Sequence, residues 1–155
     1  MRNKHLIVLI IIVLVFISIQ FIRPERNMEV FQNRNELFFH HKDAPQLVRV
    51  NLLNACYNCH SNKTAYPWYA SVAPASWIIR ANITKAKSEL NFSEWHLYDS
   101  DKQHKLLMEI SEVLENNSMP PKPYRWFHRI ANLSEVERQE ISTWATGYAN
   151  TLGRN

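Results

Sequence analysis

The scarcity of glycine most constrains what this chain can fold into, because only two of its 155 residues are glycine. Glycine supplies the positive φ angles that tight β-hairpin turns and phosphate-binding loops require. A strand-rich sandwich and a phosphate-cradling loop are therefore poor descriptions of this sequence. The length suits one domain with a core of its own. We expect an all-α fold.

Local signals predict where the main helices begin. Apolar residues recur at helical spacing after four starts, at Pro45, Pro74, Ser100 and Ser134. Proline suits the first turn of a helix. Each serine is followed three residues later by a capping-box partner, Gln103 or Glu137. Residues 119–123 contain three prolines and are expected to lie outside any helix. Gly147 interrupts the last helix, which close approach of another helix would explain.

The N-terminal segment predicts a membrane anchor. Residues 6–22 are apolar except for Ser18 and Gln20, and as a helix they would be roughly 25 Å long. Arg2 and Lys4 precede this stretch, as in an export signal. Large side chains follow it where a small-X-small cleavage site would be needed. We therefore expect an uncleaved signal anchor, with a cleaved signal peptide as the alternative.

The chain is expected to comprise a membrane anchor, a linker and a folded domain, at residues 1–23, 24–44 and 45–150. The formal net charge is +4, but three of the 18 basic residues and none of the 14 acidic ones lie in residues 1–23. The rest of the chain is thus close to neutral and has no basic stripe. This distribution argues against a nucleic-acid partner.

The chemistry of the chain is carried by the segment Cys56-Tyr57-Asn58-Cys59-His60, which holds both of its cysteines. Cys-X-X-Cys-His is the attachment signature of c-type haem. Two thiols spaced in this way near a helix end can each add to one vinyl group of the haem. The adjacent His60 can then bind the iron. We predict one covalently attached haem c per chain.

Three other interpretations of the two cysteines are weaker. A thioredoxin-like dithiol needs a preceding strand, and here a helical pattern precedes the motif. A structural zinc site needs four ligands, and no third cysteine exists. A disulfide between Cys56 and Cys59 would close too small a loop to stabilise much. Haem attachment also places the domain on the periplasmic side of the bacterial inner membrane.

Met119 is the predicted sixth ligand of the iron. Two prolines follow it and hold the segment extended, between two predicted helices. The alternatives are His96, His104 and His128. Candidates for packing on the haem ring are Trp68, Tyr69, Trp77 and Trp126. Candidates for propionate contacts are Tyr66, Tyr69, Arg80 and Arg125. Any one of these side chains is equally well interpreted as an ordinary core or surface residue with no contact to haem.

Further stretches accompany the haem motif along the chain. They are Tyr66-Pro67-Trp68-Tyr69, Ala73-Pro74-Ala75-Ser76-Trp77, Asn91-Phe92-Ser93-Glu94-Trp95, Met119-Pro120-Pro121 and Leu133-Ser134. With these stretches, residues 45–145 resemble the haem-binding domain family of bacterial membrane-anchored cytochromes. The layout is also similar to class I cytochrome c, with the methionine before the last helix and that helix near the first. The resemblance implies a cytochrome c-like helical domain around the haem.

Together these features predict a membrane-anchored monohaem c-type cytochrome that transfers single electrons to and from redox proteins of the bacterial envelope. Such a carrier needs no acid–base pair or nucleophile, so we do not expect an enzyme. The alternative is a haem-based peroxidase-like enzyme or a gas or redox sensor, with an open or labile sixth iron position. A haem module serving only assembly or partner docking is a third hypothesis.

Overall fold

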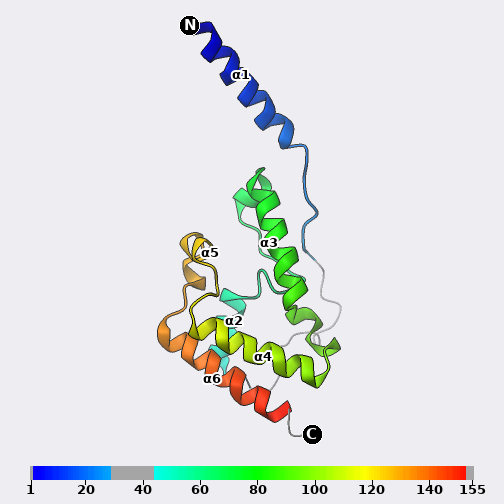
Figure 1. Ribbon diagram of the computed structural model, residues 1–155, viewed down its shortest axis with the longest axis vertical. Coiled ribbons are helices and arrows are strands. Elements are labelled where there is room, and N and C mark those ends of the chain that lie inside the picture. Colours follow the sequence, from blue (N-terminus) through cyan, green and yellow to red (C-terminus); the bar gives the residue numbers. More distant parts are fainter. Residues whose placement is uncertain (1, 29–43, 153–155) are drawn as a thin grey trace.

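The computed structural model describes residues 2–28 and 44–152, and every regular element in these ranges is helical (Figure 1). The α-helices are α1 (Arg2–Ile19), α2 (Gln46–Ala55), α3 (Ala75–Glu89), α4 (Ser100–Glu115), α5 (Lys122–Phe127) and α6 (Glu135–Leu152). Three 3-10 helices join them: η3 (Trp68–Ser71), η4 (Phe92–Leu97) and η5 (Arg129–Ala131). The all-α prediction is confirmed. Most of the predicted linker, residues 29–43, lies outside the described residues.

The core is built where α4 and α6 pack along one another and α2 contacts α6 (Figure 1). Leu107 and Leu114 of α4 and Ile141 and Ala145 of α6 are almost fully buried. Leu52 of α2 joins the same cluster. Burial of each leucine or isoleucine stabilises the fold by about 1.5–3 kcal/mol relative to exposure. The apolar periodicity of the sequence places Leu52, Leu114, Ile141 and Ala145 on these inner faces, but it does not place Leu107 there.

The two predicted capping boxes have different outcomes. At the start of α6, the Ser134 N–H and hydroxyl both donate to Glu137 Oε2 at 2.7 Å, and the Glu137 N–H lies 3.3 Å from Ser134 Oγ. At the start of α4 the cap is Asp99, whose Oδ1 accepts from the Lys102 N–H at 2.8 Å. The prediction of Ser100 as the capping residue was therefore wrong by one position.

Two expectations about helix breakers also need correction. Helix α5 begins at Lys122 and holds Pro123 in its first turn, where a missing N–H costs no hydrogen bond. The prediction that residues 119–123 lie outside any helix thus holds only for residues 119–121. At Gly147 a methyl group would meet no heavy atom of the described residues within 4 Å, so no described helix approaches closely there.

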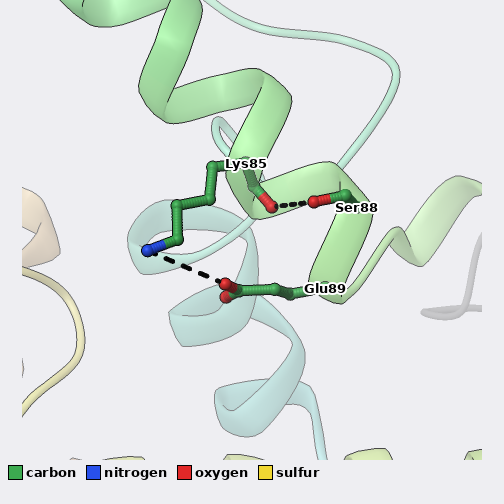
Figure 2. A network of polar contacts seen from close by, with 3 residues as sticks. All are labelled: Lys85, Ser88 and Glu89. Carbon is green, nitrogen blue, oxygen red and sulfur yellow. Dashed lines mark hydrogen bonds and ion pairs between the residues drawn. The ribbon is translucent and has the colours of Figure 1, made fainter.

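The C-terminal end of helix α3 lies beside the haem motif. Its C-terminal turns face solvent on one side, where Lys85 and Glu89 form an exposed ion pair at 4.0 Å (Figure 2). The Ser88 hydroxyl donates to the Lys85 carbonyl at 2.7 Å (Figure 2). Exposed pairs of this kind contribute about 0.3–0.5 kcal/mol. The residue after α3, Leu90, turns inward and is buried.

Helix α1 extends away from the other helices (Figure 1). It ends at Ile19, so the apolar stretch at residues 6–22 is helical for only part of its length. Large side chains from Leu6 to Ile17 are between 47% and 59% exposed. Within residues 2–28 and 44–152, no helix has the length and apolarity needed to cross a membrane. The predicted transmembrane helix is therefore not supported by the structure.

The residues after α1, which we call the strap (residues 20–28), lie against the folded domain. The Gln20 side chain donates to the Ala73 carbonyl at 3.2 Å and accepts from the Ala73 N–H at 2.9 Å. The Trp77 Nε1–H donates to the Ile22 carbonyl at 2.9 Å. Met28 forms an isolated β-bridge with Lys63. Residues 24–28, predicted as linker, are thus docked on the domain.

Candidate haem-attachment site

The haem motif occupies the turn that directly follows α2. Cys56 is the C-terminal cap of this helix, and its N–H donates to the Leu52 carbonyl at 2.9 Å. The N–H groups of Cys59 and His60 both donate back to the Cys56 carbonyl, at 3.2 and 3.0 Å. Because α2 buries Val48 and Leu52 in the core, the turn is held at a fixed place. Both cysteines are half-buried free thiols.

The imidazole of His60 is oriented by the end of α3. Its Nδ1 atom lies 3.1 Å from the Leu90 carbonyl oxygen. A carbonyl can only accept, so Nδ1 carries the hydrogen and Nε2 keeps the lone pair. Burial is the main cause that lowers the pKa of His60 below its ordinary value, so the ring is neutral at neutral pH. Iron-binding histidines need this neutral form and this type of hydrogen bond.

The backbone beside His60 is fixed as well. The Phe92 N–H donates to the His60 carbonyl at 2.8 Å, which ties η4 to the motif. The Phe92 ring meets the imidazole edge-on, with ring centroids 6.4 Å apart. Phe92 is fully buried. The ring plane of His60 is therefore restricted by packing in addition to its hydrogen bond.

The electrostatics of the two thiols distinguish between the interpretations of the motif. Burial, with a smaller contribution from the nearby charge of Cys59, raises the pKa of Cys56 to about 12. Burial also raises the pKa of Cys59. A thioredoxin-like dithiol needs a lowered thiol pKa and a preceding strand. The described residues provide neither at this turn, and the arrangement favours haem attachment.

A polar aromatic cluster lies beside the motif. The Asn58 Nδ2–H donates to the Tyr124 hydroxyl at 3.1 Å, which links the motif to α5. The Tyr124 ring stacks on His128 with centroids 4.1 Å apart. His128 Nδ1 lies 3.1 Å from the Tyr124 carbonyl and therefore carries its hydrogen, so the Tyr69 hydroxyl donates to His128 Nε2 at 3.3 Å. This cluster unites α5, η3 and the motif.

Tyr124 also lies close to both thiols. Burial is the main cause that raises its pKa, and charges on Cys59 and Cys56 raise the pKa further. Sequence reasoning missed Tyr124 as a site residue. Its position in the first turns after the Met119-Pro120-Pro121 stretch was the available signal.

The other predicted site residues are placed as follows. Tyr69 belongs to the cluster just described, and Trp68 packs its ring edge-on against Tyr69 with centroids 5.8 Å apart. Trp77 points to the strap, where it bonds the Ile22 carbonyl, and the structure does not bring it to the motif. Met119 is half-buried in the turn between α4 and α5, and its N–H donates to the Val113 carbonyl at 3.3 Å.

The part of the domain around the motif leaves much apolar surface uncovered. Helix α3 buries only Ser76 and Ile83, and α5 buries none of its residues. Large apolar side chains in or beside η3 and α5 are 69–82% exposed, namely Trp68, Trp126, Phe127 and Ile130. Such surface marks a ligand or partner site. No group of three or more His, Cys, Asp or Glu side chains in the described residues is placed to hold a bare metal ion.

These residues fit a haem group. Two thiols, a neutral imidazole with Nε2 available and adjacent exposed aromatic side chains would provide the attachment, the iron ligand and apolar ring contacts. The fold and site thus define an all-helical haem-binding domain. Residues 14–147 match the family model of the haem-binding domain, and the chain belongs to this family. Comparison with curated proteins and with solved structures gave no significant match.

Proposed function

We propose that the chain is a membrane-anchored monohaem c-type cytochrome that transfers single electrons. In this proposal Cys56 and Cys59 attach the haem by thioethers, and His60 binds the iron through Nε2. The hydrogen bond from His60 Nδ1 to the Leu90 carbonyl is the observation that carries the proposal, because it orients the imidazole independently of the metal. When bound, the haem supplies one-electron redox chemistry.

We propose Met119 as the sixth ligand. It is half-buried five residues before Tyr124, which contacts the motif through Asn58. An axial thioether and burial raise the reduction potential relative to two histidine ligands. Ligation by His60 and Met119 would need little rearrangement between the two oxidation states. The surrounding residues, above all Tyr69 and Tyr124, would cover the ring and exclude water.

The proposal for Met119 is tested by the absorption spectrum of the purified full chain. We expect a methionine-to-iron charge-transfer band in the oxidised protein. The band is lost in Met119→Ala and kept in Met108→Ala, a matched control on the outer face of α4 with 40% of Met108 exposed. A high-spin ferric spectrum with ready CO binding in the unmodified protein contradicts the proposal.

The proposed location is the bacterial inner membrane, with the haem domain on the periplasmic side and redox proteins of the envelope as partners. The support is the row of exposed apolar side chains from Leu6 to Ile17. Extraction of membranes with alkaline carbonate tests this part. The full chain is expected to stay with the membrane, and a chain beginning at residue 20 to be released. Release of the full chain contradicts anchoring.

A second candidate function is a peroxidase-like enzyme or a gas or redox sensor with an open or labile sixth position. The cluster of Tyr69, Tyr124 and His128 favours it, because proton-carrying groups lie beside the motif. CO binding by the reduced unmodified protein separates the two candidates. If His128→Ala alters this CO binding and Met119→Ala has no effect on it, the second function is supported and the proposal of electron transfer is contradicted.

A further inference from the structure

Asn27 of the strap is a buried residue with a hydrogen bond at each of its polar groups. It is only 6% exposed. Its side-chain Nδ2 donates to the Ser61 carbonyl at 2.7 Å and to Thr64 Oγ1 at 2.9 Å. Its Oδ1 accepts from Lys87 Nζ at 2.9 Å. The side chain thus joins the strap to the turn after the motif and to α3.

The backbone of Asn27 is bonded to the same turn. Its N–H donates to the Tyr66 hydroxyl at 2.8 Å, and its carbonyl accepts from the Thr64 N–H at 3.0 Å. Every polar group of this buried residue therefore has a partner. Buried polar networks of this kind fix one arrangement, because breaking a single bond leaves an unsatisfied group in a medium of low dielectric constant.

The network continues into the motif itself. The Thr64 hydroxyl, which accepts from Asn27, donates to the Asn58 carbonyl at 2.6 Å. Asn58 Oδ1 accepts from the Ala65 N–H at 3.1 Å. Ser61, whose carbonyl Asn27 holds, directly follows His60. Asn27 is therefore hydrogen-bonded to the backbone on both sides of Cys59 and His60. It bonds Ser61 directly and Asn58 through the Thr64 hydroxyl.

We propose that Asn27 is a positioning residue of the haem site. It holds the turn of residues 61–66 against the motif and so fixes the backbone from which His60 projects. Asn27 lies 33 residues before His60 and contacts neither the thiols nor the imidazole through any of its five hydrogen bonds. The inference rests on the proposed haem attachment at Cys56 and Cys59. It also makes the strap part of the haem domain.

The chain offers a variant that isolates the two Nδ2 bonds. Asn27→Asp keeps the side-chain volume and an acceptor for Lys87 but has no N–H to donate to Ser61 and Thr64. Glu25→Ala is the matched control, because Glu25 is an exposed residue of the same strap, two positions before Asn27. Asn27→Ala removes all three side-chain bonds.

The test compares the full holoprotein and these variants by three measurements: the electron paramagnetic resonance spectrum of the ferric form, the reduction potential and the thermal unfolding midpoint. We expect Asn27→Asp to keep covalent haem but to show more than one low-spin ferric species and a shifted potential. Glu25→Ala should match the unmodified chain. A lowered midpoint with an unchanged spectrum and potential in Asn27→Asp overturns the inference, because it shows a role in stability alone.

Failure of the proposed function gives a different result. In that case the unmodified chain carries no covalent haem, and amide hydrogen exchange in residues 58–66 of the same full chain tests the inference. Faster exchange in Asn27→Asp than in Glu25→Ala supports the positioning of this turn by Asn27. Equal exchange in the two variants contradicts it, whether or not Asn27→Ala folds.

Discussion

The Nδ1 atom of His60 lies 3.1 Å from the carbonyl oxygen of Leu90, the residue that caps the C-terminus of α3. This contact joins the turn after α2 to the end of a helix 30 residues further along the chain. It selects one tautomer of the imidazole and directs Nε2 away from the Leu90 carbonyl. The fold thus orients the imidazole that we propose as the iron ligand.

Replacement of His60 tests this role directly. In His60→Ala the thiols remain, so we expect haem still attached but lacking its axial imidazole. Added imidazole should restore a low-spin absorption spectrum, because the deleted ring leaves space where it was held. His96→Ala, at an exposed position in η4, should leave the spectrum unchanged. A low-spin spectrum in His60→Ala without added imidazole would show that another residue is the ligand.

Gly147→Ala is expected to stabilise the fold. The position is in the interior of α6, where glycine is less favourable than alanine by about 1 kcal/mol. In the part of the chain that the structure describes, a methyl group there meets no heavy atom within 4 Å. Urea unfolding followed by circular dichroism should give a higher midpoint with an unchanged slope. A lower midpoint would show that α6 has a close neighbour at this position.

Glu137 is expected to make stability depend on pH. Two hydrogen bonds from Ser134, first the backbone N–H and then the hydroxyl, lower the pKa of this carboxyl below 4.5. A carboxyl with a lowered pKa in the folded state contributes stability above its unfolded pKa, and this contribution disappears as pH falls through the folded value. Because Glu137 is only partly buried, the effect is small.

The measurement for Glu137 is urea unfolding of the unmodified chain and Glu137→Gln at several pH values. The difference between them should be largest near neutral pH and shrink below about pH 4. Glu140→Gln, an exposed position on the same helix, is the control and should show no such trend relative to the unmodified chain. A constant difference for Glu137→Gln across this range would contradict the capping role of its charge.

Features coded by neighbouring residues could be predicted from the sequence. The haem motif, the inner face of α6 and the Ser134 capping box depend on residues within a few positions of one another. Asp99 replaced Ser100 as a cap because either side chain can accept from an N–H, and only the backbone conformation decides between them. Pro123 was misjudged because proline is compatible with a first helical turn as well as with a loop.

Features that depend on distant contacts could not be predicted. The Leu90 carbonyl is a backbone group and has no sequence signal of its own. Asn27 fell in a predicted linker, and its partners Ser61 and Thr64 lie 34 and 37 residues away. The stacking of Tyr124 on His128 follows from the helical turn of α5. The prolines before this helix had predicted a loop where it begins.

Extraction of the full chain with acidified acetone, followed by a spectrum of the protein fraction, tests the central claim most directly. The chain is produced together with a bacterial apparatus for cytochrome c assembly. We predict that the haem stays with the unmodified polypeptide and is extracted from the Cys56→Ala, Cys59→Ala double variant. Extraction of haem from the unmodified chain would contradict covalent attachment at Cys56 and Cys59.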